Sequence, residues 1–225
     1  MISVIIPTLD QASKLDRALQ PLVAASMGGL VKQVIVADAG SSDDTLALAE
    51  AAGCEIVRSA PGRAKQMRAG AAAAKGKWLL FLHADTVLCD GWIAEVAAFL
   101  QQPQARKRAA AFRLNFPDSS AAARRAAQLA RLRAQVMKLP YGDQCLLISR
   151  YLYDAVGGYP DIPAMEDVEI IRRIGQHRLI LLKTEAVSSA EHHRRGGYDK
   201  RAWRNIVLMT RYLMGADPVE LAKAE

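Results

Sequence analysis

The fold class is decided by residues 34–44, whose sequence is VIVADAGSSDD. The stretch opens with an apolar run typical of a buried strand, turns at Asp38, and passes into serines and aspartates that favour a helix N-terminus. The helix predicted there spans residues 43–52 and ends before Gly53, because glycine accepts the left-handed backbone that often closes a helix. A strand that leads directly into a helix predicts a βα unit.

The same alternation continues on both sides of this stretch. Continuous apolar runs predict buried strands at residues 4–6, 34–36, 78–82 and 146–148, with weaker candidates at 55–58, 110–114 and 179–182. Helical patterns occur at residues 14–25, 43–52, 63–74, 92–100 and 121–139. Strands without alternating polarity, separated by helices, predict a mainly parallel sheet covered on both faces. Because no linker, repeat or composition break divides the chain, we expect residues 1–225 to form a single α/β domain.

Bulk composition narrows the class of protein. Hydrophobic residues make up 51% of the chain and charged residues 24%, which indicates a folded globular protein. No apolar run approaches the roughly 20 residues that span a bilayer, and residues 2–7 resemble a strand rather than a signal peptide. Cys54, Cys89 and Cys145 form no C-x-x-C pair, so neither a zinc site nor a disulfide framework is indicated. We therefore expect cytoplasmic residence.

Acidic residues follow three of the apolar runs. Asp10, Asp38 and Asp85 each come shortly after a predicted strand. Each acid alone could be only a turn former or a helix cap. Because ligands of open parallel sheets bind beyond the carboxyl ends of the strands, three acids at one edge favour a nucleotide site. One acid would then serve the base or ribose, and another a metal ion on the phosphates.

Two common nucleotide motifs are absent. The loop after the first strand lacks the G-x-G-x-x-G of dinucleotide-binding proteins, and the chain contains no G-x-x-x-x-G-K-[ST] P-loop. A nucleotidyltransferase of related fold usually has a glycine-rich, basic loop after strand one. Residues 7–12 contain no glycine, which makes that class less favoured without eliminating it.

Six segments together resemble the family 2 glycosyltransferases. They are residues 4–9, 36–43, 62–67, 80–86, 141–144 and 165–169, in this order along nearly the whole chain. The resemblance is closest to a bacterial subgroup found near radical-SAM and selenium-domain genes. It implies the single-domain GT-A fold, in which residues 1–100 would bind the nucleotide-sugar and residues 101–225 would hold the acceptor and the C-terminal helices. The implied activity is transfer of a sugar from a UDP- or GDP-sugar to an acceptor hydroxyl.

The resemblance assigns the donor side of the site residue by residue. Asp38 would hold the base or ribose, and Asp10 would lie near the nucleotide. The full set of implied donor-binding residues is Pro7, Thr8, Asp10, Asp38, Gly40, Arg63, Arg68, Ala84 and Asp85. The basic residues of residues 63–68 could bind phosphate at a helix N-terminus, or could form a solvated basic face. Arg68 replaces an asparagine expected in the family, which leaves its contact with the diphosphate or the donor sugar open.

The implied metal is Mg²⁺ or Mn²⁺. Asp85 matches the last aspartate of the family's D-x-D motif, here His83-Ala84-Asp85. One aspartate suffices, because these ions also take phosphate oxygens and water as ligands. His83 is a weaker candidate for a metal ligand, because a histidine at a strand end is more often a hydrogen-bonded structural residue. His192 is a candidate to complete the metal site, with Arg194 and Arg195 contacting the diphosphate.

The acceptor side follows from two later segments. Glu166-Asp167 matches the acidic pair where the family places its general base, and inverting transfer needs a carboxylate to accept the proton of the acceptor hydroxyl. We assign the catalytic role to Asp167, with Glu166 positioning it or binding the acceptor. The alternative is a plain acidic first turn of a helix. Asp143 and Gln144 are expected to shape the acceptor pocket.

The net charge of +7 concentrates in a few segments, including the predicted helix at residues 121–139. An imperfect apolar stripe is expected there, formed by Ala126, Leu129, Ala130, Val136 and Met137. The helix either lies on an anionic membrane beside a membrane-held acceptor, or packs on the sheet with its arginines in water, which we favour. Nucleic-acid binding is not expected, since no known motif occurs. The rival functions are a sugar-1-phosphate nucleotidyltransferase and a basic binding module without catalysis.

Overall fold

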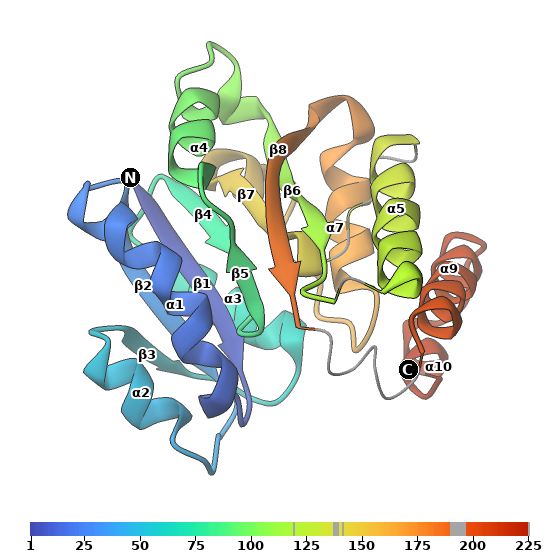
Figure 1. Cartoon of the computed structure of the whole chain (residues 1–225), viewed down its shortest axis with the longest axis horizontal. Coiled ribbons are helices and arrows are strands. Elements are labelled where there is room, and N and C mark those ends of the chain that lie inside the picture. The colour runs from blue at the N-terminus through green and yellow to red at the C-terminus, as the bar shows by residue number, and fades with distance from the viewer. Residues whose placement is uncertain (119, 137–139, 141, 190–196, 225) are drawn as a thin grey trace.

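One eight-stranded sheet runs through the part of the chain that the structure describes. The computed structural model describes residues 1–118, 120–136, 140, 142–189 and 197–224. The strand order is β3-β2-β1-β4-β7-β6-β8-β5 (Figure 1). The strands are β1 (Ile2–Thr8), β2 (Val31–Asp38), β3 (Glu55–Arg58), β4 (Trp78–Phe81), β5 (Thr86–Leu88), β6 (Ala109–Asn115), β7 (Leu146–Ser149) and β8 (Leu179–Ser188).

The sheet is parallel in its first half and mixed in its second. β3, β2, β1 and β4 pair in parallel, so the βα pattern predicted from residues 34–44 is confirmed. β7 then lies antiparallel between β4 and β6, β8 is parallel to β6, and β5 is antiparallel to β8. The predicted mainly parallel arrangement therefore holds for β1 to β4, whereas the whole sheet is mixed. The sequence did not indicate the short strand β5.

Helices cover both faces of the sheet, as predicted. They are α1 (Ala12–Met27), α2 (Thr45–Ala51), α3 (Arg63–Ala73), α4 (Trp92–Leu100), α5 (Ala121–Val136), α6 (Arg150–Ala155), α7 (Glu166–Ile174), α9 (Tyr198–Leu213) and α10 (Pro218–Ala222). α1 and α4 pack on one face with Val4 and Ile6, while α3 and α7 pack on the other face with Ile5. No described helix is long and apolar enough to cross a membrane.

α3 approaches the sheet closely enough to fix the position of its N-terminus. A Cβ atom added at Gly70 would lie 2.4 Å from a methyl carbon of Ile5 on β1, so only glycine fits there. On the same helix, the side-chain amide of Gln66 donates to the carbonyl oxygens of Thr8 at 2.6 Å and Ala37 at 2.9 Å. α3 is thereby held at the carboxyl ends of β1 and β2, and its first residue, Arg63, lies at this edge of the sheet.

α5 packs on the rest of the protein through a row of alanines that includes Ala126 and Ala130 of the predicted stripe. Its buried face contacts Leu114, Phe116 and Tyr198. Leu129, also predicted on the stripe, is 46% exposed, because the buried face is centred on the alanines and not on this leucine. That face is formed by Ala123, Ala126, Ala127, Ala130 and Ala134. The side chain of Val136 and residues 137–139 lie outside the described part of the chain.

Candidate active site

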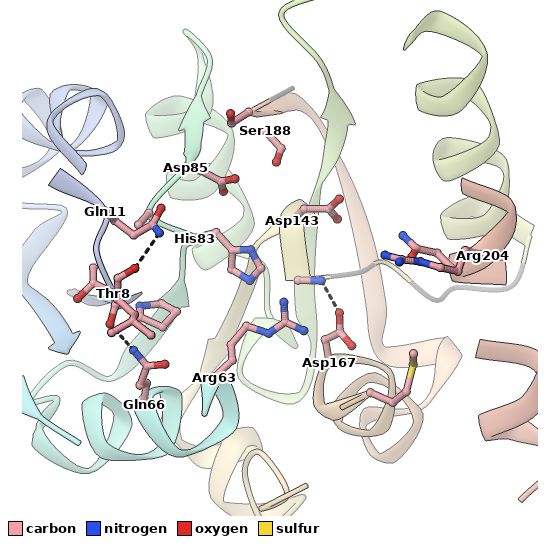
Figure 2. A pocket seen from close by; sticks show the side chains of 17 residues that line it. Thr8, Gln11, Arg63, Gln66, His83, Asp85, Asp143, Asp167, Ser188 and Arg204 are labelled. Atoms are coloured by element: carbon pink, nitrogen blue, oxygen red, sulfur yellow. Dashed lines mark hydrogen bonds between the residues drawn. The ribbon is translucent and has the colours of Figure 1, made fainter. Parts of the chain in front are cut away.

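A cavity of about 400 Å³ lies at the carboxyl ends of β1 and β4 (Figure 2). It is bounded by the loops after these strands, the start of α3, the start of α7, the end of β8 and one turn of α9. The residues that line it are Pro7, Thr8, Leu9, Gln11, Arg63, Gln66, His83, Ala84, Asp85, Gly142, Asp143, Met165, Asp167, Ser188, Ser189, Arg204 and Asn205. Seven predicted site residues are among them, namely Pro7, Thr8, Arg63, Ala84, Asp85, Asp143 and Asp167.

Asp85 sits in the turn that connects β4 to β5. The backbone N–H of Thr86 donates to the carbonyl oxygen of His83 at 3.1 Å, which closes this turn. The backbone N–H of Ser189 donates to the carbonyl oxygen of Asp85 at 3.0 Å, which brings the end of β8 to the same point. Ser188 and Ser189 therefore line the cavity beside Asp85, although they are about a hundred residues away in sequence.

Asp167 faces the cavity from the first turn of α7. Its Oδ2 accepts a hydrogen bond of 2.8 Å from the backbone N–H of Gly142, and its Oδ1 one of 2.8 Å from the N–H of Val168. These two bonds fix the carboxylate relative to the short helical turn η2 (Gly142–Gln144). Asp143 lies on the same turn, so the two acids project into one space (Figure 2).

Glu166 points away from the cavity and holds Arg63. Nε of Arg63 donates to Oε1 of Glu166, a residue that is only 1% exposed. Burial raises the pKa of Glu166, and the positive charge of Arg63 opposes this shift. The pair joins the starts of α3 and α7 and leaves Arg63 on the cavity wall. The structure thus places Glu166 against Arg63, while Asp167 is the member of the acidic pair that lines the cavity.

Buried polar atoms beside the cavity lack hydrogen-bond partners among the described residues. They include Nε2 of His83 and Oδ1 of Asp143. Burial lowers the pKa of His83 to about 4, which the charge of Arg63 reinforces, so this ring is neutral near pH 7. Burial also raises the pKa of Asp143 to about 6, although Arg133 opposes the shift. Unsatisfied buried atoms are rare in folded proteins and indicate a place where a ligand, an ion or water completes the bonding.

Asp38 lies beneath the cavity without lining it. Its buried carboxylate accepts hydrogen bonds from the backbone N–H groups of Gly40 at 2.8 Å and Ser41 at 2.9 Å, and from the hydroxyl of Thr8 at 3.1 Å. The Ser41 hydroxyl also donates to it. Burial alone raises the pKa of Asp38, but the bonds from Ser41, Gly40 and Thr8 outweigh it and hold the pKa below its usual value. Asp38 therefore affects the cavity indirectly, by fixing the hydroxyl of Thr8, which lines it.

Asp10 and Gly40 belong to the loops that frame this side of the cavity. Asp10 is exposed and accepts from the backbone N–H of Ser42 at 2.8 Å, which fastens the loop after β1 to the loop after β2. Asp10, Cys145 and Met165 are the described non-glycine residues with positive φ, at 52°, 55° and 63°. Each lies within two residues of the cavity lining, and such backbone strain commonly gathers at functional sites.

The remaining predicted residues lie elsewhere or outside the described part of the chain. Arg68 turns away from the cavity and donates to the carbonyl oxygen of Tyr159 at 3.0 Å. Gln144 is buried behind the cavity, and its amide donates to the carbonyl oxygen of Phe112 at 2.9 Å. His192, Arg194 and Arg195 fall within residues 190–196, which are outside the described residues.

Several lining residues were not predicted as site residues. Gln66 was part of a recognised motif, and its two bonds to strand-end carbonyls could not be inferred from spacing. Ser188 and Ser189 follow a weak strand signal, and Arg204 and Asn205 lie on α9 in a segment read only as basic. These residues come from distant parts of the sequence, so only the folded chain brings them to the cavity.

The cavity suits a metal bound together with phosphate oxygens better than a metal held by protein alone. Among the described residues, no group of three or more His, Cys, Asp or Glu side chains is placed to hold a metal ion. Asp85 offers one carboxylate, and Oδ1 of Asp143 is an unsatisfied oxygen on the same cavity. Mg²⁺ and Mn²⁺ accept such a sparse protein shell when a substrate supplies further oxygens.

Comparison with known sequences agrees with this geometry. Residues 3–142 match the model of the family described as Glycosyl transferase family 2. A PGL/p-HBAD biosynthesis glycosyltransferase from Mycobacterium bovis is 33% identical over 108 residues, covering 44% of this chain and 41% of that protein. Glucosyl-3-phosphoglycerate synthase from Mycolicibacterium paratuberculosis is 30% identical over 95 residues, covering 38% and 29%. The chain thus spans less than half the length of these curated relatives.

Solved structures share the fold. Glucosyl-3-phosphoglycerate synthase from Mycobacterium tuberculosis, in complex with Mn²⁺, UDP-glucose and phosphoglyceric acid, superposes with a TM-score of 0.61 at 20% identity, covering 93% of this chain and 79% of that one. TarS from S. aureus superposes with a TM-score of 0.64 at 16% identity, covering 93% and 65%. These likenesses bear out the GT-A architecture implied by the sequence motifs. Since the family model matches more than half of the residues, the chain belongs to glycosyl transferase family 2.

Proposed function

We propose that this protein transfers a sugar from a nucleotide-sugar to an acceptor hydroxyl in the cavity of about 400 Å³, with inversion at the anomeric carbon. One observation carries the proposal. Asp85 and Asp167 come from opposite halves of the chain and line the same cavity, with Arg63 beside them (Figure 2). An acid suited to the leaving group and an acid suited to the acceptor therefore share one space.

The donor half would be formed by residues 1–100. Thr8 and Pro7 line the cavity at the end of β1, and Asp38 fixes the Thr8 hydroxyl from below. Because the Mycobacterium tuberculosis enzyme with the same fold was solved with UDP-glucose, a UDP-sugar is the first donor to test, with a GDP-sugar as the alternative. Arg63, held by Glu166, is placed to meet the negative charge of the diphosphate.

Asp85 would hold a Mg²⁺ or Mn²⁺ ion, together with diphosphate oxygens and water. When bound, the ion would neutralise the charge that builds on the departing diphosphate. Asp85 contributes one carboxylate, and Asp143, whose Oδ1 is unsatisfied in the same cavity, is a candidate for a second oxygen. Whether His192 joins them stays a prediction, because it lies outside the described residues.

Asp167 would act as the general base. The oxygen of the acceptor hydroxyl attacks the anomeric carbon, the bond from this carbon to the diphosphate oxygen breaks, and the hydroxyl proton passes to the carboxylate of Asp167. The bonds from Gly142 and Val168 keep this carboxylate aimed at the cavity. Orientation of this kind is a large part of catalysis, because the reacting atoms need near-contact geometry.

The acceptor would be held by residues 101–225, through Asp143 and the neighbouring end of β8.

Three further proposals do not concern the cavity. The motif order supports membership of the subgroup near radical-SAM and selenium-domain genes, and cytoplasmic residence stays a proposal. The arginines of α5 support contact with an anionic membrane. Flotation with anionic liposomes at physiological salt tests the membrane contact, and a protein that stays in the bottom fraction would refute it.

The first experiment is a thermal-shift screen of UDP- and GDP-sugars with and without MnCl₂. A bound ligand stabilises the folded state by mass action, by about 2.7 kcal/mol at one hundred times its Kd. We expect one nucleotide-sugar to raise the melting temperature only with metal present, and Asp85→Asn to lose this rise. Asp154→Asn, an exposed change on α6, is the matched control.

Turnover separates the proposal from its rivals. Incubation with the donor identified by the screen should release a nucleoside diphosphate above background. Release of pyrophosphate from a nucleoside triphosphate would instead indicate a nucleotidyltransferase. Absence of any nucleotide-sugar turnover in the presence of manganese, with the donor bound, would indicate a binding protein.

A further inference from the structure

A second cavity of about 310 Å³ lies between α5, β6 and the first residues of β8. It shares no lining residue with the first cavity, but Gln144 on its wall directly follows Asp143 on the wall of the first. The lining consists of Arg113, Arg131, Ala134, Gln144, Leu179, Ile180 and Leu181. Two arginines and no carboxylate therefore line this space among the described residues.

Glu185, an acid beside these arginines, already has partners for both of its oxygens. Glu185 forms an ion pair with Nη2 of Arg131 through Oε1, and its Oε2 accepts from the side-chain amide of Asn115 at 2.7 Å. Nε of Arg131 is nevertheless buried without a hydrogen-bond partner in the described part of the chain. A buried donor without an acceptor is unfavourable, and an anion in the cavity would supply the missing acceptor.

Arg113 supplies a second guanidinium on the same wall. Within residues that the structure describes, it has neither a hydrogen-bond nor an ion-pair partner, although Glu185 is its neighbour in the parallel pairing of β6 with β8. Both oxygens of Glu185 are engaged by other donors, so the charge of Arg113 is not neutralised by contact. Two guanidinium groups with donors to spare form a setting for bidentate recognition of a carboxylate or a phosphate.

Most of the remaining lining of the cavity is apolar. Leu179, Ile180 and Leu181 of β8 line it together with Ala134 of α5. Small-molecule sites are usually clefts of about 300–1,000 Å³ with apolar walls and a few polar groups that fix orientation. The second cavity lies at the lower end of this range, so its occupant would be small.

We propose that the second cavity binds a small organic anion, a phosphate monoester or a carboxylate with an apolar body, through Arg113 and Arg131. The anion has two conceivable sources. Because the adjacent residues Asp143 and Gln144 line the first and the second cavity, the anion is either the charged end of the acceptor itself or a separate effector molecule. Binding in the second cavity does not depend on the glycosyl transfer proposed above, so it can be tested alone.

The test is a titration with phenyl phosphate, followed by NMR of protein with labelled isoleucine methyl groups. Ile180→Val assigns the Ile180 signal. We expect this signal to shift and saturate, because the aromatic ring would lie against Ile180, and benzyl alcohol, which lacks the anion, to produce no saturable shift. Arg113→Gln should weaken phenyl phosphate binding about tenfold or more, since it removes charge-assisted hydrogen bonds.

Two further variants keep the result interpretable. Arg178→Gln removes an exposed arginine from η3 (Gln176–Arg178) that does not line the cavity, and should bind phenyl phosphate like the unmodified protein. Arg113→Lys keeps the charge but loses the planar fork, so its affinity should fall between the other two. An Ile180 signal that does not respond, or equal affinity in Arg113→Gln and the unmodified protein, would overturn the proposal.

A second arm distinguishes the two sources. Glycerol 3-phosphate carries a phosphate and free hydroxyls, and is incubated with the donor and MnCl₂ before mass spectrometry. Addition of one sugar, reduced in Arg113→Gln but not in Arg178→Gln, identifies the anion as part of the acceptor. Saturable displacement of phenyl phosphate by glycerol 3-phosphate, without any added sugar, identifies a separate effector. Failure of both anions to perturb Ile180 contradicts the site itself, whether or not the donor is turned over.

Discussion

The two walls of the main cavity differ in how their polar groups are satisfied. On the wall built from β1, β2 and α3, Asp38 and Gln66 bond to strand ends and loops, and their polar atoms are engaged within the protein. On the wall that faces it, Nε2 of His83 and Oδ1 of Asp143 are buried without partners among the described residues. One wall is complete before any ligand binds, and the other is completed by what binds.

The proposed function offers a reason for this difference. A nucleotide is the same in every catalytic cycle, so rigid loops that are already hydrogen-bonded lower the entropic cost of binding it. Unsatisfied acids and a neutral imidazole store unfavourable energy that a metal, diphosphate or acceptor can relieve. Substitutions on each wall test this difference.

Asp167→Asn gives the largest expected effect. The amide cannot accept a proton, so kcat should fall by about 10²–10⁴-fold, the usual contribution of a general base. The donor-induced thermal shift should persist, because the donor wall is unchanged. Initial rates at saturating donor, with Asp154→Asn as control, measure this. A loss of donor binding equal to the loss of rate would mean that Asp167 binds the donor instead of acting as the base.

Asp38→Asn should destabilise the fold. The backbone N–H groups of Gly40 and Ser41 bond to one oxygen of Asp38, and the hydroxyls of Thr8 and Ser41 bond to the other. The new amide keeps a single acceptor oxygen and cannot serve both pairs, and a buried donor left unsatisfied costs about 1–3 kcal/mol. Because the folded-state pKa of Asp38 is lowered, its contribution is present above the unfolded pKa, near 3.9, and is lost as pH falls through the folded value. Urea unfolding should therefore separate variant and parent at pH 7 more than at pH 3.

Asp143→Asn should act in the opposite direction. The folded-state pKa of Asp143 is raised to about 6, so the folded protein loses stability as pH rises from the unfolded value through this point. The amide avoids that loss, and the ligand-free variant should melt higher than the parent at pH 8 but not at pH 4. Equal melting temperatures at pH 8 would indicate that Asp143 is not desolvated in solution. Asp143 would then not be an unsatisfied buried group that distinguishes its wall from the other.

Arg68→Gln should have the smallest effect. Arg68 bonds to the carbonyl oxygen of Tyr159 outside the cavity, so stability should change by no more than about 0.5–1.5 kcal/mol and donor affinity should hardly change. Isothermal titration with the donor measures the affinity, with Arg63→Gln as the matched change on the cavity wall. A comparable loss of affinity in both variants would mean that Arg68 contacts the donor after all.

The sequence predicted the first half of the fold better than the second. Residues 34–44 contain the strand, the turn and the helix start of one βα unit, and local chemistry of this kind repeats through β1 to β4. α6 was not predicted, the C-terminal helices α9 and α10 were expected from the family resemblance without their bounds, and the stripe expected on α5 included Leu129, which is exposed. Helices that pack through alanine or along a shallow surface give a weak periodic signal, because little apolar area distinguishes their buried face.

The amino-acid sequence was enough to indicate the family, the order of strands and helices in the first hundred residues, and the acids that are candidates for chemistry. The folded chain was needed to show that Glu166 turns to Arg63 while Asp167 faces the cavity, and that Arg68 and Gln144 turn away from it. Residue type and local spacing set propensity and chemistry, whereas the direction of a side chain depends on packing and hydrogen bonds between segments as far apart as Arg63 and Glu166, 103 residues along the chain.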